Sequence, residues 1–140
     1  VKASLKYIPD RSVDIRRIKD AGLRVVLATN PIFPADGVKT RMAWVGLKPE
    51  DFELVTNYDN STFCKPNPDY YREILTKIGE KPENCLMVGN NIAEDMEPAS
   101  SLGMSVFFVP EFAENPQGRD ASAYVQGSVS DAADHAIAHI

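Results

Sequence analysis

The sequence predicts an α/β fold in which a parallel sheet carries helices on both of its faces, making three layers. Short apolar runs alternate with segments whose apolar residues recur every three or four positions, in the order helix, strand repeated four times. Elements that alternate in this way form parallel strands joined by right-handed crossovers. A chain of 140 residues is most simply one domain with a substantial core.

The N-terminal half supplies two helices and two strands. A helix is expected over 12–21, because Ile15 and Ile18 lie on one face and a glycine follows its end. The run LRVVLAT at 23–29 is apolar throughout and is typical of a strand covered on both faces. A second helix is expected over 35–45 and a short strand over 52–56.

The helix after residue 66 has the clearest local signals. Asn67 is expected to cap it, Pro68 suits its first position, and Gly79 is expected to end it. Its apolar residues are spaced three or four apart, which predicts one buried face. The remaining elements are expected to be a strand over 85–88, a helix over 95–102, a strand over 104–109, a loop over 110–128 and a helix over 131–140.

Composition excludes several classes of function. The net charge is −5, with no basic run, so nucleic acid is not expected as a partner. No apolar run reaches the roughly 18 residues of a membrane span. Cys64 and Cys85 are expected to be unpaired thiols of a cytoplasmic protein. His135 and His139 lack further ligands near them in sequence and are expected on a solvated helix face.

Polar residues follow the predicted strands at the edge where ligands bind in parallel sheets, beyond the carboxyl ends. Two predicted helices also begin there, and their N-terminal ends attract anions. A hydroxyl, an ammonium and amides on one rim would suit a phosphate group. The residues concerned are Thr29, Asn30, Lys65, Asn90 and Asn91.

Each of these residues also has a simpler interpretation. Thr29 and Asn30 precede a proline and are common turn formers. Lys65 could be a solvated loop lysine, and Asp95 could be an acid favoured by the N-terminal end of a helix. Their shared order along the chain and shared edge favour a common site.

Three motifs in this order resemble those of the haloacid dehalogenase-like (HAD) hydrolases, a superfamily dominated by phosphatases. They are VVLATN, KPNP and MVGNNIAED, and the resemblance covers residues from about 12 to 110. It implies a Rossmann-like core in which Thr29, with Asn30 beside it, binds a phosphoryl oxygen. Lys65 would neutralise the charge shared by phosphate and nucleophile. It also implies that the loop with Asn90, Asn91 and Asp95 holds Mg²⁺.

Two departures from the family pattern stand out. The family's loop usually offers an aspartate after its glycine, whereas this chain has Asn90 and Asn91, which bring no charge, so metal affinity is expected to fall. The family's first motif, an apolar strand ending in D-x-D-x-T/V, carries the nucleophile and has no match here. The nearest stretch, Asp59-Asn60-Ser61-Thr62, lacks the second aspartate and is not expected to serve.

We therefore expect residues 1–140 to be the C-terminal portion of a HAD-like core domain, incomplete on its N-terminal side and without the nucleophile strand or a cap. The whole protein is expected to be a Mg²⁺-dependent phosphatase of a small phosphorylated metabolite, acting through an aspartyl-phosphate. This chain alone is expected to be inactive. The alternatives are an inactive HAD-like module that binds a phosphorylated ligand or a partner, and a receiver-like signalling domain. The sequence indicates neither the substrate nor the oligomeric state.

Overall fold

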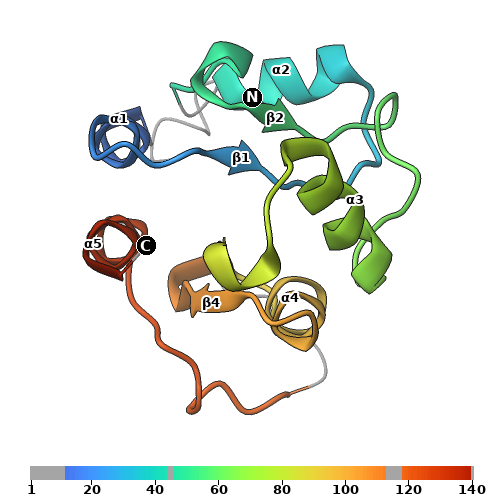
Figure 1. Ribbon diagram of the computed structural model, residues 1–140. Helices are drawn as coiled ribbons and strands as arrows, with labels where there is room; N and C mark the ends of the chain where they lie inside the picture. Colours follow the sequence, from blue (N-terminus) through green and yellow to red (C-terminus); the bar gives the residue numbers. More distant parts are fainter. Residues whose placement is uncertain (1–11, 44–45, 113–117, 140) are drawn as a thin grey trace. The chain divides into compact units, whose positions relative to one another are not determined.

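The computed structural model describes residues 12–43, 46–112 and 118–139, and the elements are labelled in Figure 1. The chain forms two compact units, whose boundary falls between Ser61 and Thr62. Each unit contains helices and one pair of parallel strands, so the predicted α/β class with parallel strands is confirmed. Among the described residues, no helix is long and apolar enough to cross a membrane.

The first unit follows the predicted order of elements with shorter strands. Its register pairs Val26 with Leu54 and Leu27 with Val55. Among the described residues of this unit, β1 and β2 pair with each other, so each ladder stops where its partner stops. The elements are α1 (Ser12–Asp20), β1 (Val26–Leu27), α2 (Ala35–Ala43), the 3₁₀ turn η2 (Pro49–Asp51) and β2 (Leu54–Val55).

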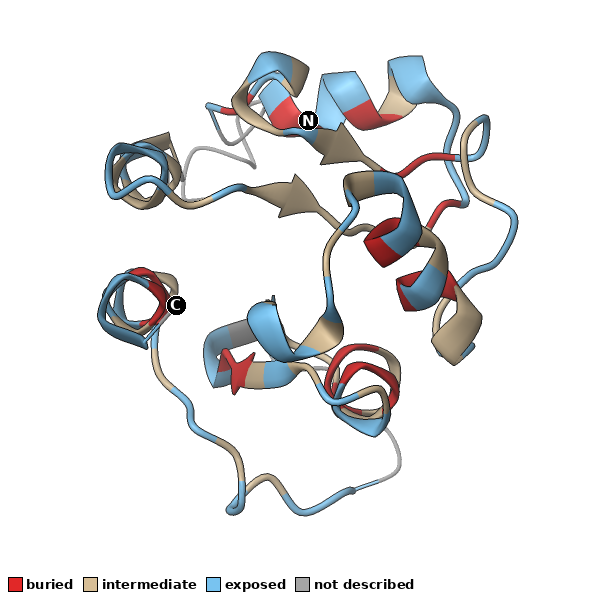
Figure 2. Cartoon of the chain, in the orientation of Figure 1, coloured by how far each residue is buried: buried red, intermediate tan, exposed pale blue. Residues whose placement is uncertain are grey.

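The core of this unit lies under α2. Val38, Met42 and Leu47 are buried there, and Leu27 and Val55 pack against them. The two strands are half-buried rather than covered on both faces, which corrects the expectation for 23–29. The difference is visible in Figure 2, where β1 and β2 are tan while α2 carries buried residues. The predicted end of α2, residues 44–45, lies outside the described residues.

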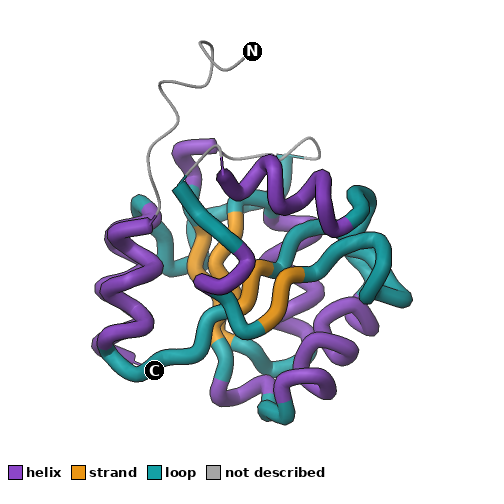
Figure 3. Tube along the Cα trace, turned by 90° about the horizontal axis from the view of Figure 1, so that it is seen from above, coloured by secondary structure: helices purple, strands orange, loops and turns teal. Residues whose placement is uncertain are grey.

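The second unit holds the longer strand pair, which forms four register pairs from Leu86↔Ser105 to Gly89↔Phe108. The strands are short segments set among longer helices and loops (Figure 3). The elements are α3 (Pro68–Ile78), the 3₁₀ turn η3 (Pro82–Asn84), β3 (Leu86–Gly89), the π-helical turn η4 (Ile92–Met96), α4 (Glu97–Ser101), β4 (Ser105–Phe108), the 3₁₀ turn η5 (Pro110–Phe112) and α5 (Val129–His139).

Helix α3 has the ends that its sequence predicts. The Asn67 side chain accepts a hydrogen bond from the Asp69 N–H at 2.9 Å, Pro68 occupies the first position, and Gly79 ends the helix in the left-handed conformation at φ 68°. Tyr70, Tyr71, Ile74 and Leu75 are its buried residues. This face packs against α4 and gives the second unit part of its core.

The helix after β3 begins earlier than predicted. A π-helical turn starts at Ile92, and the α-helical part, α4, starts at Glu97 rather than Asp95. Pro98 is tolerated because it lies in the first turn of α4, as expected. Asp95 therefore lies inside the wide turn.

The segment predicted as loop over 110–128 contains more structure than expected. Gln126 forms a parallel bridge with Phe108, and the Phe108 N–H donates to the Val125 carbonyl at 2.9 Å. Helix α5 then starts at Val129, before the predicted residue 131. The reason is a reciprocal cap, because the Ser128 hydroxyl accepts from the Asp131 N–H at 3.0 Å while the Asp131 carboxylate accepts from the Ser128 N–H.

The two histidines lie on α5 as predicted, with different surroundings. His139 is exposed, but the half-buried His135 ring packs against Phe107 with ring centroids 5.5 Å apart. The solvated face therefore includes His139 and only part of His135. Among the described residues no cluster of three or more His, Cys, Asp or Glu side chains could hold a metal.

Candidate functional site

In the second unit, Lys65 and Asp95 form a buried ion pair. The Lys65 Nζ lies 2.6 Å from the Asp95 Oδ1, and the two side chains are only 9% and 6% exposed. These residues are thirty positions apart in sequence and come from the loop before α3 and from the turn after β3. The interpretation of Lys65 as a solvated loop lysine is therefore wrong.

The second carboxylate oxygen of Asp95 organises the loop after β3. Its Oδ2 accepts hydrogen bonds from the backbone N–H groups of Asn90 and Asn91, each at 3.1 Å. The approach is so close that a Cβ on Gly89 would come within 2.6 Å of the Asp95 Cγ. The Asp95 carboxylate thus links the backbone of the glycine turn to Lys65.

The wide turn after β3 places Asp95 in this position. The Asn91 side chain accepts from the Glu94 N–H at 3.0 Å and begins the turn, and the Glu97 N–H reaches back five residues to the Ile92 carbonyl. A π-helical turn of this kind is frequent at functional sites. The Asp95 carboxylate then faces back toward the N–H groups that start the turn.

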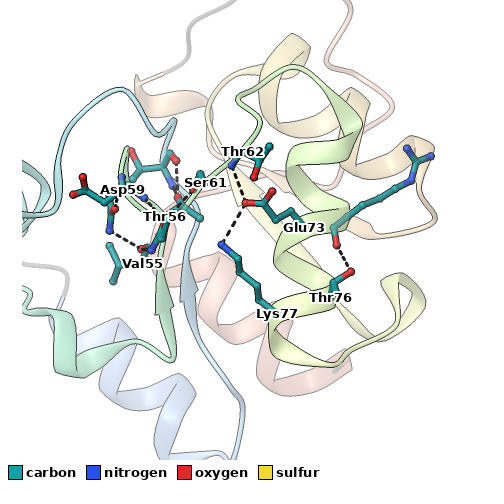
Figure 4. Close-up of polar contacts among 12 residues, drawn as sticks. Val55, Thr56, Asp59, Ser61, Thr62, Glu73, Thr76 and Lys77 are labelled. Atoms are coloured by element: carbon teal, nitrogen blue, oxygen red, sulfur yellow. Dashed lines mark hydrogen bonds and ion pairs between the residues drawn. The ribbon is translucent and has the colours of Figure 1, made fainter.

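The loop that carries Lys65 is hydrogen-bonded to α3 at its start and forms a tight turn just before the helix. The Thr62 N–H donates to the Glu73 carboxylate at 2.9 Å, and the Asn67 N–H donates to the Cys64 carbonyl at 3.0 Å. Lys77 also contacts Glu73, at 3.3 Å, as Figure 4 shows. Slight burial would raise the pKa of Glu73, but these hydrogen bonds outweigh it and lower the pKa below its ordinary value.

Tyr71 of α3 reaches the same turn from the helix side. Its hydroxyl donates to the Glu94 backbone carbonyl at 2.7 Å. Burial, and then the negative charge of Asp95, raises the pKa of Tyr71 far above its ordinary value of 10.0, with smaller effects from Tyr70 and Glu94. The phenol is therefore a neutral hydrogen-bond donor at physiological pH.

In the first unit, Thr29 and Asn30 follow β1, where the sequence places them. The Thr29 N–H donates to the Thr56 Oγ1 at 2.9 Å, and the same hydroxyl donates to the Thr29 carbonyl at 2.6 Å. Thr56 is only 2% exposed and follows β2. The Asn30 carbonyl accepts from the Ile32 N–H at 2.8 Å, so Asn30 does take part in a tight turn.

The stretch Asp59-Asn60-Ser61-Thr62 has a structural use in its first two residues. The Asp59 carboxylate accepts from the Ala35 N–H at 3.1 Å at the start of α2, and the Asn60 side chain donates to the Val55 carbonyl at 2.8 Å. The Asn57 N–H donates in turn to the Asn60 side chain. These contacts hold the turn after β2, and the expectation that Asp59 is not a nucleophile stays a prediction.

The oxygen atoms near the glycine turn do not make a magnesium site by themselves. Both oxygens of the Asp95 carboxylate already have partners in Lys65 and in two backbone N–H groups. The Asn91 Oδ1 is the cap of the wide turn, and neither asparagine brings charge. Mg²⁺ prefers carboxylate oxygens in octahedral geometry. The roles of Asn90, Asn91 and Asp95 as metal ligands stay a prediction.

The structure thus brings together four of the six candidate residues, all in the second unit: Lys65, Asn90, Asn91 and Asp95. The convergence of Thr29 and Asn30 on the same phosphate group stays a prediction. Sequence reasoning missed Thr56 and Tyr71. A buried hydroxyl at a strand end could have indicated Thr56, but the partner of Tyr71 depends on the π-helical turn.

Comparison with known proteins relates the chain to one family of hydrolases. The model of a family of hydrolases, the haloacid dehalogenase-like hydrolases, matches residues 15–103. A glyceraldehyde 3-phosphate phosphatase of Methanothermobacter thermautotrophicus is 33% identical over 107 residues, which cover 76% of this chain and 46% of that protein. A phospholysine phosphohistidine inorganic pyrophosphate phosphatase of Xenopus laevis is 31% identical over 74 residues, covering 53% of this chain and 26% of that protein.

Solved structures show the same fold. The crystal structure of a predicted phosphoglycolate phosphatase from Haemophilus somnus matches with a TM-score of 0.76 and 20% identity, over 95% of this chain and 60% of that one. This chain spans about half or less of the length of the two curated relatives above. The family match covers well over half of the chain and includes Thr29, Lys65 and Asp95. The chain therefore belongs to the haloacid dehalogenase-like hydrolase family.

Proposed function

We propose that this chain supplies the phosphate-binding part of a phosphatase that acts on a small phosphorylated metabolite. The observation that carries the proposal is the buried Lys65 ammonium, which Asp95 holds at 2.6 Å beside the glycine turn. A charge fixed in place before the reaction stabilises a phosphoryl group without the cost of reorganisation. An unconstrained lysine on the surface would lack this advantage.

The surroundings of Lys65 favour an anion, although the ion pair itself is neutral overall. Helix α3 has eleven residues and begins at Pro68, three positions after Lys65, so its positive N-terminal end lies close in sequence to the ammonium. In the proposed site the Thr29 hydroxyl, beside Asn30, donates to a phosphoryl oxygen. The relatives named above include a phosphatase of a small phosphate ester, which supports this substrate class.

The proposed reaction uses an aspartate nucleophile that lies outside these 140 residues. Its carboxylate attacks phosphorus, the bond from phosphorus to the ester oxygen breaks, and the alcohol leaves after it gains a proton from a general acid. Water then attacks phosphorus and gives its proton to the conjugate base of the general acid, the bond from phosphorus to the aspartate oxygen breaks, and the carboxylate is regenerated as inorganic phosphate leaves. Lys65 stabilises the charge on the phosphoryl oxygens in both steps. Family members use Mg²⁺, whereas the oxygen set that this chain offers for such an ion is incomplete.

A second candidate function is a HAD-like module that binds a phosphorylated ligand and has lost catalysis. The observation that favours it is the pair Asn90 and Asn91, where carboxylates would be expected for a metal. The receiver-like alternative is set aside, because the haloacid dehalogenase-like family model matches most of the chain.

The test is Lys65→Ala in the intact protein, with p-nitrophenyl phosphate as a generic ester and Mg²⁺ present. We expect turnover to fall on the order of a hundredfold or more, as when a preorganised stabilising group is lost. Lys77→Ala is the matched control, because this lysine is 39% exposed and pairs with Glu73 on the surface of α3. Undiminished turnover in Lys65→Ala refutes the assigned role. Absence of hydrolysis by the unaltered intact protein favours the second candidate.

A further inference from the structure

The peptide group between Glu94 and Asp95 is held from both sides. Its N–H, that of Asp95, donates to the Asn91 carbonyl at 2.7 Å. Its carbonyl, that of Glu94, accepts from the Tyr71 hydroxyl at 2.7 Å. This peptide plane includes the Cα of Asp95, so its orientation affects the direction in which the Asp95 side chain leaves the backbone.

The carbonyl of Glu94 has a special need for an outside donor. In an α-helix its partner would be the N–H four residues later, but residue 98 is a proline and has no N–H. The surrounding turn is π-helical, with the Glu97 N–H bonded to the Ile92 carbonyl. A hydroxyl delivered from another helix compensates for the missing donor.

The Tyr71 side chain, which provides that hydroxyl, has little conformational freedom. Its side chain is 1% exposed, and its ring packs edge-on against Tyr70 with centroids 4.9 Å apart. It lies in the first turn of α3, the helix that starts directly after the loop with Lys65. The N-terminal end of α3 thus approaches both partners of the ion pair, because the Lys65 Nζ lies 6.0 Å from the centroid of the Tyr70 ring and Tyr71 bonds the carbonyl next to Asp95.

We propose that Tyr71 is a positioning residue, which holds the Glu94 carbonyl and thereby keeps Asp95 directed at Lys65 and at the N–H groups of Asn90 and Asn91. The inference deepens the proposed function, on which its catalytic consequence rests, but its structural part stands alone. The raised pKa of Tyr71 agrees with it, because the phenol keeps its proton throughout the neutral range.

The first test uses no catalytic activity. Hydrogen exchange of the Asn90 and Asn91 amides is measured by NMR in the intact protein and in Tyr71→Phe. We expect exchange of these amides to speed up about tenfold, because loss of one hydrogen bond frees the turn locally. Ile74→Val is the matched control, since Ile74 is also buried on α3, and it should leave these amides unchanged. Equal protection in Tyr71→Phe and in the unaltered protein overturns the proposal.

A rescue variant separates positioning from general packing. Tyr71→Phe combined with Pro98→Ala restores an N–H four residues after Glu94, so protection should return to within about threefold of the unaltered protein. The same double variant carries the test if the single variant does not fold. Protection no better than in Tyr71→Phe, or failure of both variants to fold while Ile74→Val folds, overturns the proposal.

The second test concerns turnover. In the intact protein with p-nitrophenyl phosphate, Tyr71→Phe should lower kcat about tenfold or more with little change in KM, because the misplaced pair acts in the transition state. The double variant should recover most of kcat. An unchanged kcat beside faster amide exchange overturns the catalytic part alone. An intact protein without activity would contradict the proposed function, while the exchange result still decides the role of Tyr71.

Discussion

Breaking the buried ion pair of Lys65 and Asp95 should cost far more stability than breaking an exposed one. The perturbation is Asp95→Asn, which keeps the shape of the side chain and removes its charge. In the structure that carboxylate accepts from Lys65 at 2.6 Å and from two backbone N–H groups at 3.1 Å. All three donors lose an ionised acceptor at once.

The magnitude follows from burial. Removing one partner of a buried pair costs about 3–5 kcal/mol, because the other charge stays buried without compensation. The asparagine carbonyl still accepts one hydrogen bond, so we expect the free energy of unfolding to fall by about 3 kcal/mol, at the lower end of that range. Lys65→Met should cost less, about 2 kcal/mol, since the Asp95 carboxylate keeps its two backbone donors.

The assay is urea unfolding followed by circular dichroism, with a double-mutant cycle over both positions. The control is Glu97→Gln, which breaks the pair with Arg119. That pair is as short, at 2.7 Å, but both side chains are 40% exposed, so its loss should cost less than about 1 kcal/mol. If Asp95→Asn lowers the free energy of unfolding no more than Glu97→Gln, burial does not raise the cost of breaking this ion pair.

Three further predictions concern the same unit. Gly89→Ala should destabilise the protein by about 1–3 kcal/mol in urea unfolding, because its Cβ would lie 2.6 Å from the Asp95 Cγ; a neutral effect would contradict the close packing. Folding raises the pKa of Tyr71. Its contribution to the free energy of unfolding is therefore fully present below the unfolded-state pKa of 10.0 and is lost as the pH rises above that value. Between about pH 9 and 11 the unaltered protein should therefore lose more free energy of unfolding than Tyr71→Phe, and equal slopes would argue against the shift. Finally, Asn91→Asp should lower the Mg²⁺ concentration for half-maximal hydrolysis by the intact protein on the order of tenfold, because charge is added to the loop; no change would place the metal elsewhere.

Local signals in the sequence were enough where neighbouring residues decide the structure. Asn67, Pro68 and Gly79 define the ends of α3 through contacts within one or two turns, and the structure has each of them as predicted. The strands predicted over 23–29, 52–56 and 104–109 are shorter in the structure, because an apolar run reports burial, whereas a ladder also needs a partner of equal length.

Contacts between segments far apart in the sequence could not be predicted from local patterns. The turn after β3 begins at Ile92 because Asn91 caps it, Pro98 removes a donor and Tyr71 supplies another. No pattern within the segment itself encodes that combination. The pairing of Lys65 with Asp95 was only implied by their predicted strand ends, and the bridge between Phe108 and Gln126 lies in a segment with a loop-like composition.

The hydroxyl of Thr56 has a consequence for which residues position 56 can accept. One oxygen acts as acceptor for the Thr29 N–H and as donor to the Thr29 carbonyl, so it takes the place of a neighbouring strand's peptide at the end of β1. Valine has the same shape but neither function, whereas serine retains both. In a library of variants at position 56, the hydroxyl group rather than the side-chain volume should therefore decide which variants are retained: serine is retained and valine is lost.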